Sequence, residues 1–124
     1  MSERRQRSGA TAQARGFGAE SVAAAALEAR GWEVLGRRVR NAAGEIDLVA
    51  RRGGMLVFVE VKARPALADG AAALGPRQRA RLLAAAEIWL GEHPGEGTEG
   101  VRFDVIVVDA AGRLRRIRDA FRAE

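Results

Sequence analysis

The stretch Gly44–Arg64, GEIDLVARRGGMLVFVEVKAR, decides the fold of this chain. It contains two runs rich in Ile, Leu, Val and Phe on either side of a Gly-Gly pair, which predicts two strands joined by a turn at residues 52–54. Charged side chains interrupt these runs at Asp47, Glu60 and Lys62. Because side chains alternate along a strand, Glu60 and Lys62 point to the same face, and Asp47 on the neighbouring strand can lie beside them.

A cluster of two carboxylates and one amine is costly inside a mostly apolar sheet. Removing each ion from water costs several kcal/mol, which is on the order of the stability margin of a small domain. A divalent cation bound between Asp47 and Glu60 would lower that cost, because carboxylate oxygens suit Mg²⁺, Mn²⁺ or Ca²⁺. The alternative is a buried Lys–Glu ion pair that only holds two strands together, but such a pair would not require Asp47.

Lys62 is the only lysine among the 21 Lys and Arg residues of the chain. A sequence that uses arginine at every other basic position, yet keeps lysine here, indicates a site that rejects guanidinium. A compact ammonium group can approach a water molecule or a phosphate oxygen as a point charge, whereas the planar guanidinium group is larger and spreads its charge.

Composition narrows the possible functions. The length of 124 residues predicts a single domain, for which we expect residues 15–124, preceded by a flexible basic tail at residues 1–14. The absence of cysteine excludes disulfides and thiolate zinc sites, and a single histidine, His93, excludes a histidine-cluster metal site. There is no apolar run of the roughly 20 residues needed to cross a bilayer and no signal-peptide pattern, so we expect a cytoplasmic protein.

The net charge of +5 and a sequence pI near 11.3 come almost entirely from arginine. This balance favours a polyanionic partner, because arginine pairs bidentately with phosphate and each contact releases counterions. Charge alone does not separate specific from non-specific binding of nucleic acid.

The rest of the chain predicts an alternation of helices and strands. Alanine-rich composition predicts a first helix at residues 15–30 that ends at Gly31, and Pro76 begins a second helix that runs to about residue 90. Further apolar runs predict strands at residues 32–40, 101–109 and 113–118. The order helix, three strands, helix, two strands predicts an α/β sandwich with a central mixed sheet.

Two polar residues lie on the apolar faces of these helices. Glu20 shares a stripe with alanine and leucine side chains, and an acid there needs a partner; Gln78 shares a face with apolar residues and therefore points at the sheet. The second helix also begins with Arg77, Arg79 and Arg81, and exposed cations at a helix N-terminus oppose its dipole by roughly 0.3–1 kcal/mol each. A bound phosphate would explain them. The alternative is an arginine-rich face in an arginine-rich protein.

The residues of the first hairpin carry a family resemblance. Gly44-Glu45-Ile46-Asp47, followed by Val59-Glu60-Val61-Lys62 and Arg64, resembles the motif of the YraN family of small bacterial proteins. That family belongs to the PD-(D/E)xK phosphodiesterase superfamily and is similar to archaeal Holliday-junction resolvases. The Glu-x-Lys half alone is frequent by chance, but joined to the upstream Gly-Glu-Ile-Asp it is specific. The resemblance extends from about residue 16 to residue 108.

The resemblance implies a restriction-endonuclease-like fold with a five-stranded sheet, and metal-dependent hydrolysis of phosphodiester bonds in DNA. Asp47 and Glu60 would bind Mg²⁺ or Mn²⁺ with the backbone carbonyl of Val61 and with Glu20, which matches the glutamate of the family's first-helix motif. Lys62 would orient or help deprotonate the attacking water. The alternative for Glu20 is an ion pair with an arginine at the rim of the helix.

Other residues would support these ligands and the substrate. The resemblance places Glu45 behind the metal ligands, although it could equally be an acid that flanks a turn. Gln78 would support the site from the second helix, and the arginines would position the nucleic-acid backbone; these are Arg64, Arg77, Arg79 and Arg81. Kinship with junction resolvases implies branched DNA as substrate and a homodimer.

The sequence departs from the family pattern in two places. Family members carry Lys-Gln where this chain has Arg77-Gln78, a change that a phosphate contact tolerates but a role for a neutral amine does not. Ile46 replaces the proline that precedes the first aspartate in the superfamily. Two rival interpretations remain: a nucleic-acid-binding module with a vestigial site, and a structural or adaptor protein in which Asp47, Glu60 and Lys62 form an ion network.

Overall fold

A computed structural model of the chain describes residues 11–70 and 74–120, with the side chains described for residues 18–68 and 74–120. The elements follow the order helix, three strands, helix, two strands, with one additional short 3-10 helix, η1. They are α2 (Thr11–Ala29), β1 (Glu33–Asn41), β2 (Gly44–Arg52), β3 (Met55–Ala63), η1 (Leu67–Gly70), α3 (Pro76–Glu92), β4 (Gly100–Val108) and β5 (Leu114–Ile117).

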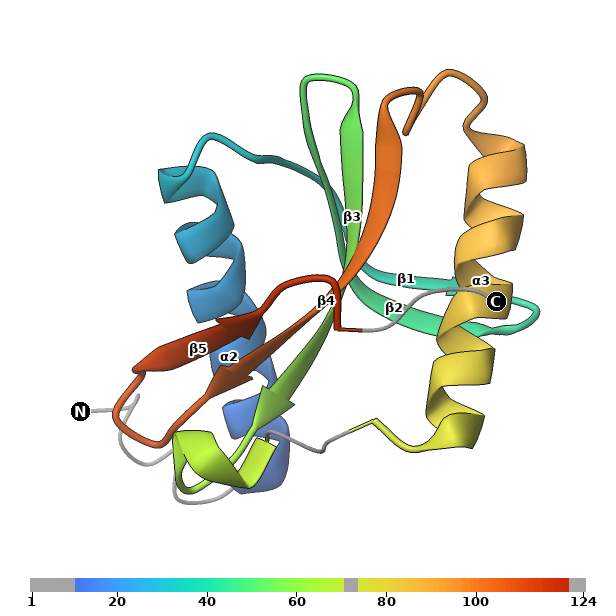
Figure 1. The fold of residues 1–124 in the computed structure, drawn as a ribbon. Helices are drawn as coiled ribbons and strands as arrows, with labels where there is room; N and C mark the ends of the chain where they lie inside the picture. Colours follow the sequence, from blue (N-terminus) through green and yellow to red (C-terminus); the bar gives the residue numbers. More distant parts are fainter. Residues whose placement is uncertain (1–10, 71–73, 121–124) are drawn as a thin grey trace.

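The five strands form one mixed sheet in the order β1-β2-β3-β4-β5. Neighbouring strands are antiparallel except β3 and β4, which are parallel and are connected through α3. Helices α2 and α3 cover opposite faces of the sheet (Figure 1). The predicted α/β sandwich is therefore confirmed, and the arrangement is consistent with a restriction-endonuclease-like fold.

The first helix begins at Thr11, four residues before the expected start at residue 15. Residues 11–14 contain neither glycine nor proline, so nothing in their composition prevents the helix from extending through them. Residues 1–10, which make up most of the predicted tail, lie outside the described residues. At the other end the predicted stop is confirmed, because Gly31 adopts a φ of 87° and donates its N–H to the carbonyl of Glu28.

Two apolar clusters hold the layers together. The cluster on the α2 side includes Trp32, Leu48 and Val59, and the cluster on the α3 side includes Ile46 and Phe58. None of the helices in the described parts of the chain is long and apolar enough to cross a membrane.

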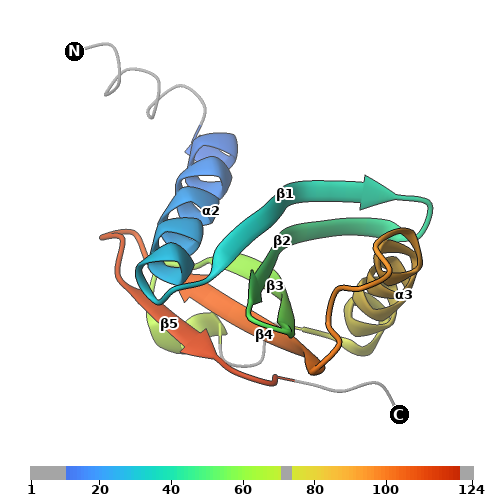
Figure 2. The same ribbon diagram turned by 90° about the horizontal axis from the view of Figure 1, so that it is seen from above.

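The β1–β2 hairpin bends where it leaves the rest of the sheet. Leu48 packs on the α2 side and Ile46 packs on the α3 side, although ordinary alternation would place these two residues on the same face. Seen from above, the hairpin curves over towards α3 (Figure 2), where the side chain of Asn41 donates a hydrogen bond to the carbonyl of Ala85 at 3.0 Å. This bend opens the sheet next to Asp47.

Candidate functional site

Asp47 lies where strands β2 and β3 separate. Their pairing runs from the turn at Arg52 and Met55 as far as Leu48 and Val59, and Asp47 is the next residue of β2. Its Oδ2 accepts a hydrogen bond from the backbone N–H of Val61 at 2.8 Å. The carboxylate therefore takes an N–H group that a continued β2 backbone would otherwise bind.

Glu60 and Lys62 point to the α3 side of the sheet, as their spacing predicts. The Oε2 atom of Glu60 is 2.9 Å from the Lys62 ammonium nitrogen, and the two side chains are only 12% and 15% exposed respectively. The same oxygen accepts a hydrogen bond from Nε2 of Gln78 at 2.9 Å. The prediction that Gln78 points at the sheet is confirmed, and the start of α3 lies beside the two carboxylates.

The electrostatic surroundings of Asp47 are acidic. The pKa of the Asp47 carboxyl is raised from 3.8 to about 7, mainly by burial and next by the nearby Glu60, whereas the hydrogen bond from Val61 opposes the shift. Two more acids, Glu20 and Glu45, act in the same direction as Glu60. Asp47 is thus a carboxyl group whose ionised form lacks compensation, as expected at a site that is completed by a cation.

Glu20 and Glu45 each pair with an arginine of β1. Oε2 of Glu20 lies 3.6 Å from Nη1 of Arg38, and Oε2 of Glu45 accepts a hydrogen bond from Nη2 of Arg40 at 3.0 Å. Burial raises the pKa of Glu20, and Arg38 partly opposes that shift. Both interpretations of Glu20 therefore keep support, because it pairs with an arginine at the helix rim and also acts on Asp47.

The donor atoms suit a hard divalent cation, but side chains alone do not complete a coordination shell. Among the described residues, no group of three or more His, Cys, Asp or Glu side chains lies close enough to hold a metal ion. With the described residues, Asp47 makes its hydrogen bond through Oδ2, and Glu60 makes its hydrogen bond and ion pair through Oε2. A bound cation could then use Oδ1 and Oε1. The N–H and C=O groups of a strand residue point towards the same neighbouring strand. The carbonyl of Val61 therefore faces the same gap between β2 and β3 as its N–H group, next to Asp47. Two carboxylates, this carbonyl and water would suit Mg²⁺ or Mn²⁺.

Three of the four arginines that the sequence suggests as phosphate contacts lie on α3, the helix that carries Gln78, and the fourth follows β3. Arg77, Arg79 and Arg81 are exposed on the first turns of α3, whose preceding residue Gly75 supplies no side-chain cap. Arg64 is half-buried and donates from Nη1 to the carbonyl of Ala63 at 2.9 Å. Their role in binding nucleic acid stays a prediction.

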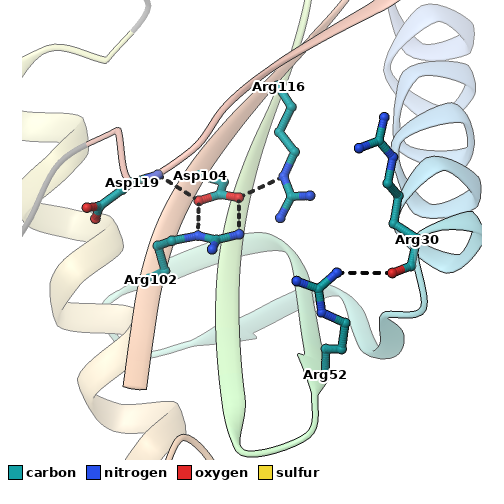
Figure 3. A network of polar contacts seen from close by, with 6 residues as sticks. All are labelled: Arg30, Arg52, Arg102, Asp104, Arg116 and Asp119. Atoms are coloured by element: carbon teal, nitrogen blue, oxygen red, sulfur yellow. Dashed lines mark hydrogen bonds and ion pairs between the residues drawn. The ribbon is translucent and has the colours of Figure 1, made fainter. Parts of the chain in front are cut away.

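Asp104, the fully buried acid of β4, belongs to a different kind of cluster (Figure 3). Its two oxygens accept hydrogen bonds from Nε and Nη2 of Arg102, from Nε of Arg116 and from the backbone N–H of Asp119, at 2.9–3.1 Å. Arg102, two residues before Asp104 on the same strand, forms an ion pair with it. Asp104 is saturated, and its role is structural.

The arginines of this cluster stack around one indole ring. The guanidinium carbons of Arg52, Arg102 and Arg116 lie 4.6, 5.5 and 5.4 Å from the ring centroid of Trp32. Arg52 also donates from Nη1 to the carbonyl of Arg30, at the end of α2. The cluster therefore ties the end of α2 to the β2–β3 turn and to strands β4 and β5.

A cavity of about 530 Å³ lies elsewhere, between α3 and the beginning of β4. Its lining includes Met55, Leu83, Leu90 and Phe103 and contains no candidate site residue. The candidate site is therefore a polar gap in the sheet and not an apolar cavity.

Sequence reasoning missed the arginines of β1. The charged run Arg37-Arg38-Val39-Arg40 predicts only a strand with a wet face, yet two of its arginines pair with the acids next to Asp47. The clustering of three arginines just before the Gly-Glu-Ile-Asp motif was the available signal.

Known proteins match this chain over nearly the same range of residues as the family resemblance of its motif. The profile described as "Uncharacterised protein family UPF0102" matches residues 19–108. A UPF0102 protein of Granulibacter bethesdensis is 61% identical over 116 residues, which cover 94% of this chain and 73% of that protein. Relatives from Azorhizobium caulinodans and a Bradyrhizobium species are 49% and 46% identical, over 91% and 87% of this chain and 86% and 77% of their own lengths.

Proposed function

The chain belongs to the UPF0102 family, which is the YraN family that its motif resembles, and from this premise we propose that it is an endonuclease. The proposed reaction is the hydrolysis of phosphodiester bonds in DNA with the help of Mg²⁺ or Mn²⁺. The substrate class, the metal ion and the reaction are all part of the proposal.

The observation that carries the proposal is the meeting of Asp47, Glu60 and Lys62 at the gap between β2 and β3. An ion network with a purely structural role would be expected to neutralise both carboxylates, as happens at Asp104. At Asp47 burial and the neighbouring acids Glu60, Glu20 and Glu45 together raise the pKa to about 7. This unbalanced negative charge favours a site that a cation completes.

In the proposed mechanism Asp47, Glu60 and the carbonyl of Val61 hold the metal ion, with Glu20 as a further candidate ligand. When bound, the ion supplies Lewis acidity and lowers the pKa of a water molecule. Lys62, at the edge of the same pocket, donates hydrogen bonds to the attacking water and offsets charge on the phosphate. Gln78 holds Oε2 of Glu60, so that the opposite oxygen keeps its direction.

The exposed arginines of α3 provide the proposed grip on the nucleic-acid backbone. Contacts of this type position the duplex and release counterions, so we expect affinity that depends steeply on salt and little on sequence. Branched DNA as the preferred substrate and a homodimer as the active form rest on kinship with junction resolvases.

A nuclease assay with Lys62→Ala tests the proposal. Linear and four-way DNA are incubated with Mg²⁺ or Mn²⁺, and we expect the variant to lose at least about 100-fold in cleavage rate while it retains DNA binding. Arg118→Gln is the matched control, because it also removes one positive charge but from an exposed residue after β5.

Each outcome of this assay separates the rival functions. Binding without cleavage in either protein would favour the module with a vestigial site, and neither binding nor cleavage would favour the adaptor. Equal cleavage by Lys62→Ala and the wild type would remove Lys62 from the mechanism.

A further inference from the structure

Arg38 has an unusual backbone conformation next to the candidate site. Its φ is 50°, in the left-handed region that residues other than glycine seldom adopt. It stands between the paired residues Arg37–Leu48 and Val39–Ile46, which places it opposite Asp47. Backbone strain of this kind persists where the surrounding structure fixes it, and it is concentrated at functional sites.

The hairpin changes sides at this rung. On β2 the change lies between Leu48 and Ile46, and Val39, which pairs with Ile46 from β1, packs on the α3 side with it. The left-handed residue therefore coincides with the bend that turns Asp47 towards the gap. Arg38 and Asp47 occupy one rung of the ladder, so a group bound at Asp47 lies within reach of a long side chain at position 38.

The side chain of Arg38 lies next to Glu20 in the free protein, and the contact between the two charged groups is long. Nη1 of Arg38 lies 3.6 Å from Oε2 of Glu20, which is beyond hydrogen-bond length. The Glu20 side chain is 12% exposed and that of Arg38 is 42% exposed. A largely buried carboxylate thus lies beside a guanidinium group that belongs to a partly exposed side chain.

We propose that Arg38 contacts a phosphate group of the nucleic acid at the gap beside Asp47, and that Glu20 holds its guanidinium group until the nucleic acid binds. This inference rests on the proposed function and adds a substrate contact to it. The guanidinium group matches phosphate geometry with two parallel hydrogen bonds, so a phosphate is a stronger partner than a carboxylate held at 3.6 Å.

The neighbouring arginines of β1 differ from Arg38 in ways that make them controls. Arg40 already shares a 3.0 Å hydrogen bond with Glu45, and its side chain is 79% exposed. Arg37 is exposed, and its positive charge lowers the pKa of Glu20 by less than the charge of Arg38 does. Arg37→Gln thus removes the same charge at the next residue without removing the ion pair with Glu20.

The test is a double-mutant cycle on nucleic-acid binding in the presence of EDTA. The proteins are the wild type, Arg38→Gln, Glu20→Gln, the double variant and the control Arg37→Gln, and the probe is a fluorescent four-way DNA junction followed by anisotropy at several salt concentrations. Arg38→Gln should weaken binding about tenfold and reduce the salt slope by about one, because one charge-assisted phosphate contact is lost. Arg37→Gln should weaken binding by no more than about threefold.

The direction in which Glu20→Gln changes the affinity for DNA shows whether Arg38 exchanges Glu20 for a phosphate group. If Arg38 must leave Glu20 to reach the phosphate, Glu20→Gln should tighten binding about threefold, and this gain should disappear when Arg38 is glutamine. Equal tightening with and without Arg38 would mean only that a repelling charge was removed, and would overturn the proposal. Equal weakening by Arg38→Gln and Arg37→Gln would also overturn it.

Two further measurements keep failure of this inference apart from failure of the proposed function. Arg38→Gly accepts a φ of 50° without strain, so it removes the guanidinium group while preserving the bend, and it replaces Arg38→Gln if that variant does not fold. Cleavage is followed in parallel with Mn²⁺. Wild-type binding without cleavage would remove the proposed hydrolysis and leave the Arg38 result standing, whereas a wild type that binds no nucleic acid would overturn both.

Discussion

Asp104 and Asp47 are two acids inside the same sheet, and their surroundings are opposite. Asp104 is fully buried and accepts four hydrogen bonds, three of them from two arginines. Asp47 is half-buried and accepts one hydrogen bond, from a backbone N–H, with acids around it. Burial alone therefore does not separate the two acids. The number and charge of their partners do.

The difference has an energetic meaning. Desolvation disfavours an ionised carboxylate at both positions, but at Asp104 two guanidinium groups and an N–H group offset this penalty within the folded chain. At Asp47 the single N–H group does not offset it, and the pKa rises to about 7. Ionisation of Asp47 thus destabilises the isolated chain, whereas the carboxylate of Asp104 is held by its hydrogen bonds and ion pairs.

Replacing Asp104 should have the largest effect on stability. Asp104→Ala leaves Arg102 and Arg116 half-buried without their carboxylate, so we expect a loss of about 3–5 kcal/mol in the free energy of unfolding. Urea denaturation measures it, with Asp119→Asn as the control, because the backbone N–H of residue 119 that bonds to Asp104 is retained there and asparagine tolerates the φ of 53° at this position. A loss below about 1 kcal/mol would show that the arginines find other partners and would weaken the contrast with Asp47.

The contrast predicts that replacing Asp47, unlike replacing Asp104, raises the free energy of unfolding. Its folded pKa of about 7 lies above the ordinary 3.8, so the folded chain binds a proton more tightly than the unfolded chain does. The stability from this group is fully present below about pH 4 and is lost as the pH rises through about 7. Asp47→Asn keeps an acceptor for the N–H of Val61 and removes this dependence.

The difference in unfolding free energy between Asp47→Asn and the wild type should therefore grow with pH, to about 2 kcal/mol in favour of the variant near pH 8 without metal. Added Mn²⁺ should then stabilise the wild type but not the variant. Denaturation from about pH 4 to pH 8, with and without the ion, measures both effects. A variant less stable than the wild type near pH 8 would place Asp47 with Asp104 as a structural acid.

The sequence alone predicts those contacts of the two acids' surroundings that follow from the periodicity of a single strand or helix. Glu60 and Lys62 share a face because they are two residues apart on one strand, and Gln78 reaches Glu60 because its helical face points inward. The ion pair of Asp104 with Arg102 has the same origin, since those residues are also two apart. These contacts need only the period of a strand or helix.

What sequence reasoning missed depends on pairing between distant elements. Arg116 joins Asp104 through the register of β4 with β5, which no local pattern fixes. The left-handed conformation at Arg38 occurs at a residue type that gives no sign of it, because glycine or asparagine would be the usual signal. The bend that separates β2 from β3 follows from that rung, so the opening of the site could not be predicted from periodicity.

Gln78 offers the smallest and most discriminating test of the comparison. Like the arginines at Asp104, it donates to a carboxylate in the sheet, but Lys62 donates to the same oxygen of Glu60 and the pair is 12–15% exposed. Gln78→Leu should therefore cost less than about 1 kcal/mol of stability, because Glu60 keeps its ammonium partner and some contact with water.

Metal binding should respond more strongly than stability. The side chain of Gln78 fixes the direction of Glu60, and loss of such support lowers metal affinity by about tenfold or more. Calorimetric titration with Mn²⁺ and urea denaturation of the same variant separate the two effects, with Glu87→Gln, an exposed change on α3, as control. A loss of stability of about 3 kcal/mol with unchanged Mn²⁺ affinity would make Glu60 a structural acid like Asp104, because its partners would then serve the fold and not a ligand. A small loss of stability with a tenfold loss of affinity would place Glu60 with Asp47, as carboxylates whose missing partner comes from outside the chain.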